Sequence, residues 1–319
     1  MAAVPEGPTG IGRSTLARRV EPVSVGASLT AERSGTCLAT YASFVKPHID
    51  VTFVLVALTG SVLAGAGGGA VPGWTLLGVA AAVAALGAGA ECFTNLIDRD
   101  IDSAMPRTAG RALPTGRISV RQAAALGAGL TAAGLAIGAG LGLFPFVFLL
   151  LAIIDNVVVY SALTKRATPW SVVLGAPVGS LVLWAGYTAV GRPLSGSAWL
   201  LGGAVAAWVP VHIWSIASRY RDDYSRAFVP MAPVVWRRGA LALASLAAAL
   251  AMGALATGGV LAVAGSASAF VAGPVALLSA AVALGAGLLP WRERLARPMI
   301  RLATAYLVLV MLAAIGLAT

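Results

Sequence analysis

Residues 74–102 read WTLLGVAAAVAALGAGAECFTNLIDRDID, a long apolar run that ends in three closely spaced aspartates. Glu91 is the one acidic residue before Asp98 in this run. A helix needs about 20 apolar residues to cross a bilayer core about 30 Å thick. The stretch therefore predicts a membrane-spanning helix with a group of carboxylates at one end.

Similar apolar runs occur along most of the chain. We expect nine membrane-spanning helices, near residues 49–67, 74–97, 121–140, 143–163, 171–190, 197–217, 239–257, 267–289 and 301–318. The composition agrees, because 59% of the residues are hydrophobic and 11% are charged, whereas a soluble domain carries roughly 25% charged residues. These features exclude a soluble protein and predict an all-α membrane protein, a bundle of helices around a central cavity.

The basic residues are distributed unevenly between the two sides of the expected bundle. The formal net charge is +10, with 22 lysines and arginines. All of them except Arg192 precede the first span or lie in every second loop after it. The positive-inside rule places these loops and the N-terminus in the cytoplasm. An odd number of spans then places the C-terminus on the other side of the cell (inner) membrane.

Residues 1–40 are mixed polar and lack the continuous apolar segment of a secretory signal. We expect a disordered cytoplasmic leader there, followed by one transmembrane domain, residues 41–319. In the third span, Gly134-x-x-x-Gly138 is typical of helices that approach each other closely. Cys37 and Cys92 have no metal-binding spacing, and we assign them no function.

The strongest chemical signal is the pair Asp98 and Asp102, which lie four residues apart and so share one helix face. Thr94 continues that row, and Asn95 borders it. Two carboxylates in a small volume repel each other unless a cation neutralises them, and Mg²⁺ prefers carboxylates together with substrate phosphates. The pair thus indicates a magnesium–diphosphate site. The alternative is an acidic helix end that pairs with neighbouring arginines.

A second acidic cluster follows the sixth span, in Arg219-Tyr-Arg221-Asp222-Asp223-Tyr224. It faces the same compartment as the first cluster, so a metal bound between the two would connect the halves of the bundle. The alternative is that Asp222 and Asp223 are ordinary loop charges.

Four cations near these clusters suit a diphosphate. Arg107 and Arg111 follow the first acidic cluster, and Lys165 and Arg166 follow the fourth span. Arginine binds phosphate oxygens in a forked geometry, and lysine adds a point charge. Each cation alone is also explained as a positive-inside anchor, but together they predict a phosphate cradle.

Several motifs make the resemblance to a known family specific. They are Lys46-Pro47, Asp98-Arg-Asp-Ile-Asp102-x-x-Met105-x-Arg107-Thr108-x-x-Arg111-x-Leu113-Pro114-x-Gly116, Tyr160-Ser161-x-x-x-Lys165-Arg166-x-Thr168, Trp208-x-Pro210-x-His212, Asp222-Asp223-Tyr224 and Pro230-Met231-x-Pro233-Val234-Val235. In this order they resemble the UbiA superfamily of intramembrane prenyltransferases, and most of all its heme-farnesylating branch, the protoheme IX farnesyltransferases. The resemblance covers residues 46 to about 235.

The resemblance implies an enzyme that moves an isoprenyl group, farnesyl in this branch, from its diphosphate to an acceptor in the membrane, here heme B. It implies Mg²⁺ as cofactor, held by Asp98, Asp102, Asp222 and Asp223. It implies catalytic roles for Asp98, Asp102, Asp223, Lys165 and Arg166, and substrate contacts from Thr94, Asn95, Arg107, Arg111, Tyr160, His212, Arg221 and Tyr224. The active site would face the cytoplasm.

Some positions depart from the branch's pattern. Thr94 and Ser171 stand where asparagine is usual, His48 follows Pro47, and a Pro-Pro pair is missing from residues 179–186. These departures leave the acceptor open, so an aromatic or quinone acceptor and a terpene cyclase remain alternatives. A transporter is a further alternative, but it would require polar residues or broken helices at mid-membrane, and the charges here lie at one face.

Two carboxylates fall within expected spans, Glu91 and Asp155. Such residues are costly in a bilayer and usually face a cavity or a partner, and we expect both to line the cavity. His212 would contact the acceptor, orient the second acidic cluster, or simply pack at the interface. The residues alone do not distinguish these roles.

Overall fold

The computed structural model describes residues 40–41, 44, 47–66, 68–264 and 269–319. The chain divides into two units, Met1–Thr36 and Cys37–Thr319, and the description below concerns the second. The expected leader, apart from Thr40, and Lys46 lie outside the described residues.

Within these residues the structure contains helices and no strand. The long helices are α2 (Pro47–Gly65), α3 (Gly73–Ile97), α5 (Val120–Leu141), α6 (Leu143–Ile153) with its continuation η1 (Ile154–Thr164), α7 (Ser171–Leu174) followed by α8 (Pro177–Thr188), α9 (Gly196–Arg219), α12 (Arg238–Ala264), α13 (Ala269–Leu288) and α14 (Ala296–Ala318). Among the described residues, eight segments are long and apolar enough to cross a membrane, and Val51–Gly65 is a shorter apolar helix. The expected spans are thereby confirmed as helices.

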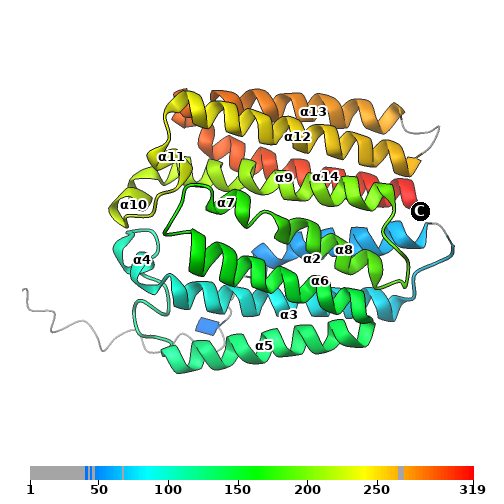
Figure 1. The fold of residues 1–319 in the computed structure, drawn as a ribbon, viewed down its shortest axis with the longest axis horizontal. Helices are drawn as coiled ribbons and strands as arrows, with labels where there is room; N and C mark the ends of the chain where they lie inside the picture. The colour runs from blue at the N-terminus through cyan, green and yellow to red at the C-terminus, as the bar shows by residue number, and fades with distance from the viewer. Residues whose placement is uncertain (1–39, 42–43, 45–46, 67, 265–268) are drawn as a thin grey trace, which may run out of the picture. The chain divides into compact units, whose positions relative to one another are not determined.

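The long helices lie side by side along a common direction (Figure 1). The short helices α4 (Arg99–Ala104), α10 (Arg221–Arg226) and α11 (Ala232–Val235) gather at one end of them, and the C-terminus lies at the opposite end. The two 3₁₀ turns η3 (Leu289–Trp291) and η4 (Glu293–Leu295) connect α13 to α14. Both acidic clusters are therefore at the same end of the bundle, as expected.

Serines define where two of the long helices begin. Ser119 accepts a hydrogen bond from the backbone of Gln122, and the Gln122 side chain accepts one from the backbone of Ser119, at 3.2 and 2.9 Å. This reciprocal capping box satisfies two amide groups that the first turn of α5 leaves without partners. Ser195 caps α9 with a single bond, by accepting from the Ala198 amide at 3.2 Å.

Glycines bring several helix backbones into direct contact. A Cβ atom on Gly134 would lie 2.9 Å from the Ala82 carbonyl oxygen of α3, and one on Gly138 would lie 2.7 Å from the side chain of Leu149 of α6. The expected close contacts of these two glycines are confirmed. The tightest approach joins α2 and α8, where a Cβ on Gly186 would lie 1.9 Å from the Ala57 carbonyl oxygen.

One spanning segment is wound as a π-helix, and its neighbour is broken. Residues Ile154–Thr164 form η1, an 11-residue π-helix that continues α6. In the next span α7 ends at Leu174 and α8 begins at Pro177. Proline has no N–H to donate to the preceding turn, which favours a restart of the helix at this residue. Both irregular segments contribute to the wall of the cavity described below.

Candidate active site

A cavity of about 380 Å³ lies among α3, η1, α7, α8 and α9. Its size falls within the range of small-molecule pockets. One end is polar and lies where α3 meets α4; the remaining wall is largely apolar and includes Phe53, Leu86, Leu149 and Val182. The lining residues of α3 and its C-cap run from Val83 to Asp98, about 22 Å along the helix axis. The cavity thus joins a charged mouth to a long apolar interior.

Ten of the expected site residues line this cavity. They are Thr94, Asn95, Asp98, Asp102, Arg107, Arg111, Tyr160, Lys165, His212 and Tyr224. The structure brings them together from α3, α4, the loop before α5, η1, α9 and α10.

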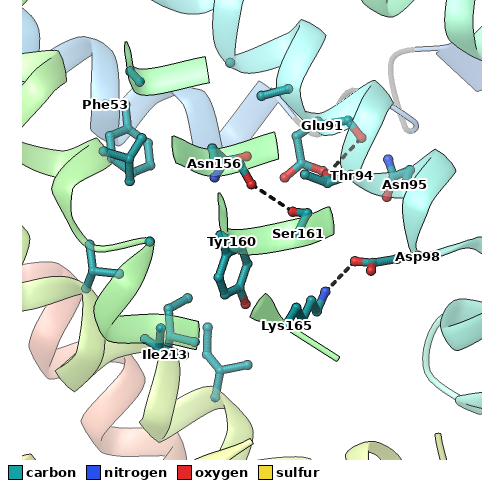
Figure 2. A pocket seen from close by; sticks show the side chains of 18 of the residues that line it. Phe53, Glu91, Thr94, Asn95, Asp98, Asn156, Tyr160, Ser161, Lys165 and Ile213 are labelled. Carbon is teal, nitrogen blue, oxygen red and sulfur yellow. Dashed lines mark hydrogen bonds and ion pairs between the residues drawn. The ribbon is translucent and has the colours of Figure 1, made fainter. Parts of the chain in front are cut away.

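Asp98 and Lys165 form a buried ion pair across the mouth (Figure 2). The lysine ammonium donates to Oδ2 of Asp98, and the exposed fractions of the two side chains are 12% and 10%. The other carboxylate oxygen, Oδ1, is buried and has no hydrogen-bond partner in the part of the chain that the structure describes. Asp98 therefore has one neutralised oxygen and one that is available to a ligand.

Lys165 also lies 5.7 Å from the centre of the Tyr160 ring, a cation–π contact. Burial alone would lower the pKa of Lys165, but Tyr160 and Asp98 outweigh this effect and the net shift of the pKa is upward. Lys165 consequently remains a cation at the mouth of the cavity.

Asp102 has a cation of its own. Arg111 donates from Nη1 to Oδ2 of Asp102 at 2.7 Å and reaches Oδ1 of Asn95 at 3.4 Å. Thr108 donates to the backbone carbonyl of Asp102 at 3.0 Å, which fixes the turn that carries Arg111. The acidic pair is thus neutralised by cations from two other segments, and both of these cations line the cavity.

Arg166 lies outside the cavity wall. It donates to both oxygens of Asp100, each at 2.6 Å, and to the Ile97 carbonyl at 2.5 Å. These hydrogen bonds from Arg166 hold the pKa of Asp100 at about 2. Arg166 therefore connects the end of η1 to the end of α3, next to the Asp98–Lys165 pair.

The second acidic cluster lies apart from the first. Arg221, Asp222 and Asp223 do not line the cavity, and Asp223 accepts from Arg226 at 3.4 Å. Among the described residues, no group of three or more His, Cys, Asp or Glu side chains is arranged to hold a metal ion. The four expected metal ligands accordingly do not form one cluster in this structure.

The two polar loops nevertheless touch. The Arg107 guanidinium lies 4.6 Å from the centre of the Tyr220 ring, and Tyr224 of α10 lines the cavity. The segment that carries Asp222 and Asp223 is therefore part of the cavity rim.

The intramembrane carboxylates behave differently from each other. Glu91 lines the cavity, as expected, and Asn156 lies opposite it (Figure 2). The expectation that Asp155 lines the cavity is wrong, because Asp155 is absent from the wall and its Oδ2 accepts from the Val178 amide at 3.0 Å. That amide belongs to the first turn of α8, which has no preceding helical carbonyl to bond. Sequence alone did not indicate the break that Asp155 repairs.

His212 lines the cavity from α9, far from the acidic mouth in sequence. Its ring stacks on Trp208, with centroids 4.6 Å apart and an interplanar angle of 19°. The cavity thus presents an imidazole to whatever occupies its interior.

The sequence did not single out Ser161 and Asn156 as members of the wall, because a π-helical register cannot be read from residue spacing.

The chain is similar in sequence to proteins of known name. The sequence profile described as "UbiA prenyltransferase family" matches residues 53–309. The chain is 40% identical over 198 residues to the "Protoheme IX farnesyltransferase" of Thermoplasma acidophilum, covering 60% of this chain and 67% of that protein. It is 38% identical over 213 residues to the protein of the same name in Gloeobacter violaceus, covering 66% and 68%.

Solved structures show the same fold. A UbiA homolog from Aeropyrum pernix K1 superposes with a TM-score of 0.70 at 25% identity, covering 84% of this chain and 98% of that one. A UbiA homolog from Archaeoglobus fulgidus, solved bound to GPP and Mg²⁺, superposes with a TM-score of 0.67 at 17% identity, covering 87% and 99%.

Proposed function

Because this chain belongs to the UbiA prenyltransferase family and is a multi-pass membrane prenyltransferase, we propose that it transfers the farnesyl group of farnesyl diphosphate to heme B. The observation that carries the proposal is the Asp98–Lys165 and Asp102–Arg111 arrangement at the mouth of a deep apolar cavity. The relatives whose name states a protoheme IX acceptor support the choice of heme.

The residues at the mouth fit a magnesium ion. Asp98 and Asp102 both line the cavity, and the buried Oδ1 of Asp98 has no hydrogen-bond partner in the described part of the chain. Mg²⁺ takes oxygen ligands, typically one or two carboxylates plus substrate phosphates. When bound, the ion would neutralise charge on the departing diphosphate. We propose Asp98 and Asp102 as its protein ligands.

The cations of the mouth would hold the donor. Lys165, Arg107 and Arg111 line the cavity beside the acidic pair, and charge-assisted hydrogen bonds to phosphate oxygens are among the strongest that proteins make. The diphosphate would lie among these cations, with the isoprenyl chain in the apolar interior. Arg166 would act indirectly, by holding the segment that carries Lys165 against α3.

The second acidic cluster would reach the site only through a movement of α10. Asp222 and Asp223 are also proposed as metal ligands, with Arg221 as a donor contact, although none of the three lines the cavity. Tyr224 already forms part of the rim. Donor binding would therefore have to draw α10 inward, and Asp223 would exchange its contact with Arg226 for the site.

The proposed reaction joins the farnesyl group to heme B and adds one molecule of water. The bond between the allylic C1 of the farnesyl group and the diphosphate oxygen breaks, and C1 forms a carbon–carbon bond with the terminal carbon of a heme B vinyl group. Water then adds to the adjacent carbon and releases a proton, which leaves a hydroxyethylfarnesyl group and free diphosphate. The apolar wall protects the allylic carbon from water before the acceptor reacts.

The charge distribution sets the proposed orientation. The acidic clusters and the cations of the mouth lie at the end of the bundle that carries α4 and α10 (Figure 1). Loops rich in arginine face the cytoplasm. We therefore place the site at the cytoplasmic face of the inner membrane, within a single transmembrane domain that begins near residue 41.

The test is a reaction of the purified protein with Mg²⁺, farnesyl diphosphate and heme B, followed by mass spectrometry of the pigment. We expect the mass of hydroxyethylfarnesyl heme, and we expect none when Mg²⁺ is chelated. Parallel reactions contain an aromatic acid, a quinone precursor, or no acceptor. A prenylated aromatic, or a cyclic terpene from farnesyl diphosphate alone, would replace the proposal with one of the two alternatives.

A further inference from the structure

Two hydrogen bonds join α9 to α14 beside the cavity interior. Trp208 donates from its indole Nε1 to the Ala303 carbonyl at 2.8 Å. One turn further along α9, Nδ1 of His212 lies 3.4 Å from the hydroxyl of Thr304. Consecutive residues of α14 therefore contact two aromatic rings that stack on each other.

The Thr304 hydroxyl has one proton, and its position decides the state of the histidine. That hydroxyl lies 3.0 Å from the Ile300 carbonyl, one turn earlier in α14, and donates to it. A carbonyl oxygen can only accept, so the hydroxyl faces His212 with its lone pairs. With the hydroxyl proton assigned to the Ile300 contact, the hydrogen of the His212 contact belongs to Nδ1, and a neutral imidazole then has its lone pair on Nε2.

Nε2 is left for a ligand. His212 lines the cavity and is half-buried, and Nε2 forms no hydrogen bond with any described residue. Stacking on Trp208 fixes the plane of the ring, and the contact with Thr304 fixes its rotation. The imidazole is thus held in one orientation at the cavity wall by contacts from α9 and α14.

We propose that Thr304 is a positioning residue that fixes the tautomer of His212, so that Nε2 coordinates the iron of the bound porphyrin acceptor. This inference rests on the proposed heme acceptor and adds how the acceptor is held. A neutral imidazole is a common iron ligand, and the partner of its second nitrogen sets tautomer and orientation. Coordination would fix the porphyrin plane relative to the farnesyl chain.

The tautomer can be measured without any substrate. The chain contains two histidines, His48 and His212, so ¹⁵N-histidine labelling yields two imidazole spectra, and H212A assigns them. We expect His212 in the wild type to be protonated on Nδ1 and bare on Nε2. T304V should mix or invert the tautomers, and T304S should preserve them. Protonation on Nε2 in the wild type would overturn the inference.

The iron bond is measured by titrating ferric heme B into the purified protein and following the Soret band and the EPR spectrum. We expect a histidine-ligated spectrum in the wild type that H212A removes. Loss of an outer partner typically costs metal sites roughly 10–100-fold in affinity, so T304V should bind heme about tenfold more weakly, with T304S near wild type. T188V is the matched control, because Thr188 also donates to a carbonyl one turn earlier, that of Trp184 at 2.8 Å. T188V should change neither the heme affinity nor the spectrum.

The outcomes separate the two proposals. If the wild type produces farnesylated heme while T304V matches T304S in affinity and spectrum, the role of Thr304 is refuted and the proposed function stands. If the wild type neither coordinates heme through His212 nor farnesylates it, both fail. The wild type could also farnesylate heme without a histidine-ligated spectrum. That result refutes the iron bond, and so this inference, while the proposed function stands.

Discussion

Asp98 shows how a single buried carboxylate can be paired with a cation and still have an oxygen available to a ligand. One of its oxygens is neutralised by Lys165, and the other has no hydrogen-bond partner among the described residues. Burying a charge without a partner is strongly unfavourable. Lys165 therefore compensates the charge of Asp98, and Oδ1 stays available to a ligand.

The acidic pair gives a direct prediction. D98N and D102N should each remove more than about 90% of the activity, since a tenfold loss corresponds to about 1.4 kcal/mol of transition-state stabilisation. D100N is the matched control, because Asp100 is exposed and lies outside the cavity wall, and it should keep most of the activity. Product formation at saturating Mg²⁺ checks this. If both cavity variants stay above a tenth of wild type, the pair is not the metal site.

Lys165 and its neighbour Arg166 should differ sharply. K165M leaves the Asp98 carboxylate buried and unpaired, and breaking such a pair costs about 3–5 kcal/mol. The double variant K165M/D98N should recover most of that stability in thermal unfolding. K165M and K165M/D98N should both lose donor binding. R166M removes an exposed pair, in which Asp100 is 69% exposed, so its cost should stay below about 1 kcal/mol. Equal losses of stability for K165M and R166M would contradict the description of Asp98–Lys165 as a buried pair and Asp100–Arg166 as an exposed one.

Much of the mouth could be predicted from the residues themselves. The i, i+4 spacing of Asp98 and Asp102 requires a shared helix face, and both do line the cavity. The pairing of Asp98 with Lys165 could not be predicted, because it joins positions 67 residues apart. The expectation for Asp155 failed for a related reason, since its partner is an amide freed by a helix break in another span.

At the scale of elements, the spans were predictable because bilayer thickness fixes how long an apolar helix must be. The expected 74–97 and 143–163 correspond to Gly73–Ile97 and Leu143–Thr164. The π-helical winding of η1 was not predictable, because it changes which side chains share a face without changing apolar content. Tyr160 of η1 and Lys165, the residue that follows η1, both line the cavity although they are five residues apart.

The contact of α2 with α8 gives a prediction at this scale. G186A should place a methyl group 1.9 Å from the Ala57 carbonyl oxygen, and such overpacking costs about 1–3 kcal/mol. G129A is the matched control, because a Cβ on Gly129 of α5 meets nothing within 4 Å. Thermal unfolding in detergent should show a loss for the first variant and none for the second. A stable G186A protein would mean that the two backbones can separate without cost.

At the scale of the whole molecule, the positive loops and the helix directions lead to one topology. In Figure 1 the C-terminus lies at the end of the bundle opposite to α4 and α10. The loops near α4 and α10 are rich in arginine, whereas Arg192 alone lies among the opposite loops. The charge distribution therefore predicts which end of the bundle faces the cytoplasm.

Reporter fusions in living cells check this orientation. A fusion to the N-terminus should be active only as a cytoplasmic reporter, and a fusion after Thr319 only as an external one, because an odd number of spans separates them. Insertions after Arg166 and after Gly191 serve as internal references for the two sides. Both ends on one side would contradict the count of nine spans.

The contacts of α14 also bear on how the protein is made. This last helix packs against α2 and α9, and α2 ends roughly 230 residues before α14 begins. A ribosome adds roughly 5–20 residues per second, so the first helix waits in the bilayer for about ten seconds or more before its last neighbour is synthesised. A nascent chain stopped before α14 would already carry every acidic and basic residue of the mouth. It would still lack Thr304, so the His212 ring would have its stacking partner Trp208 but not the contact from α14.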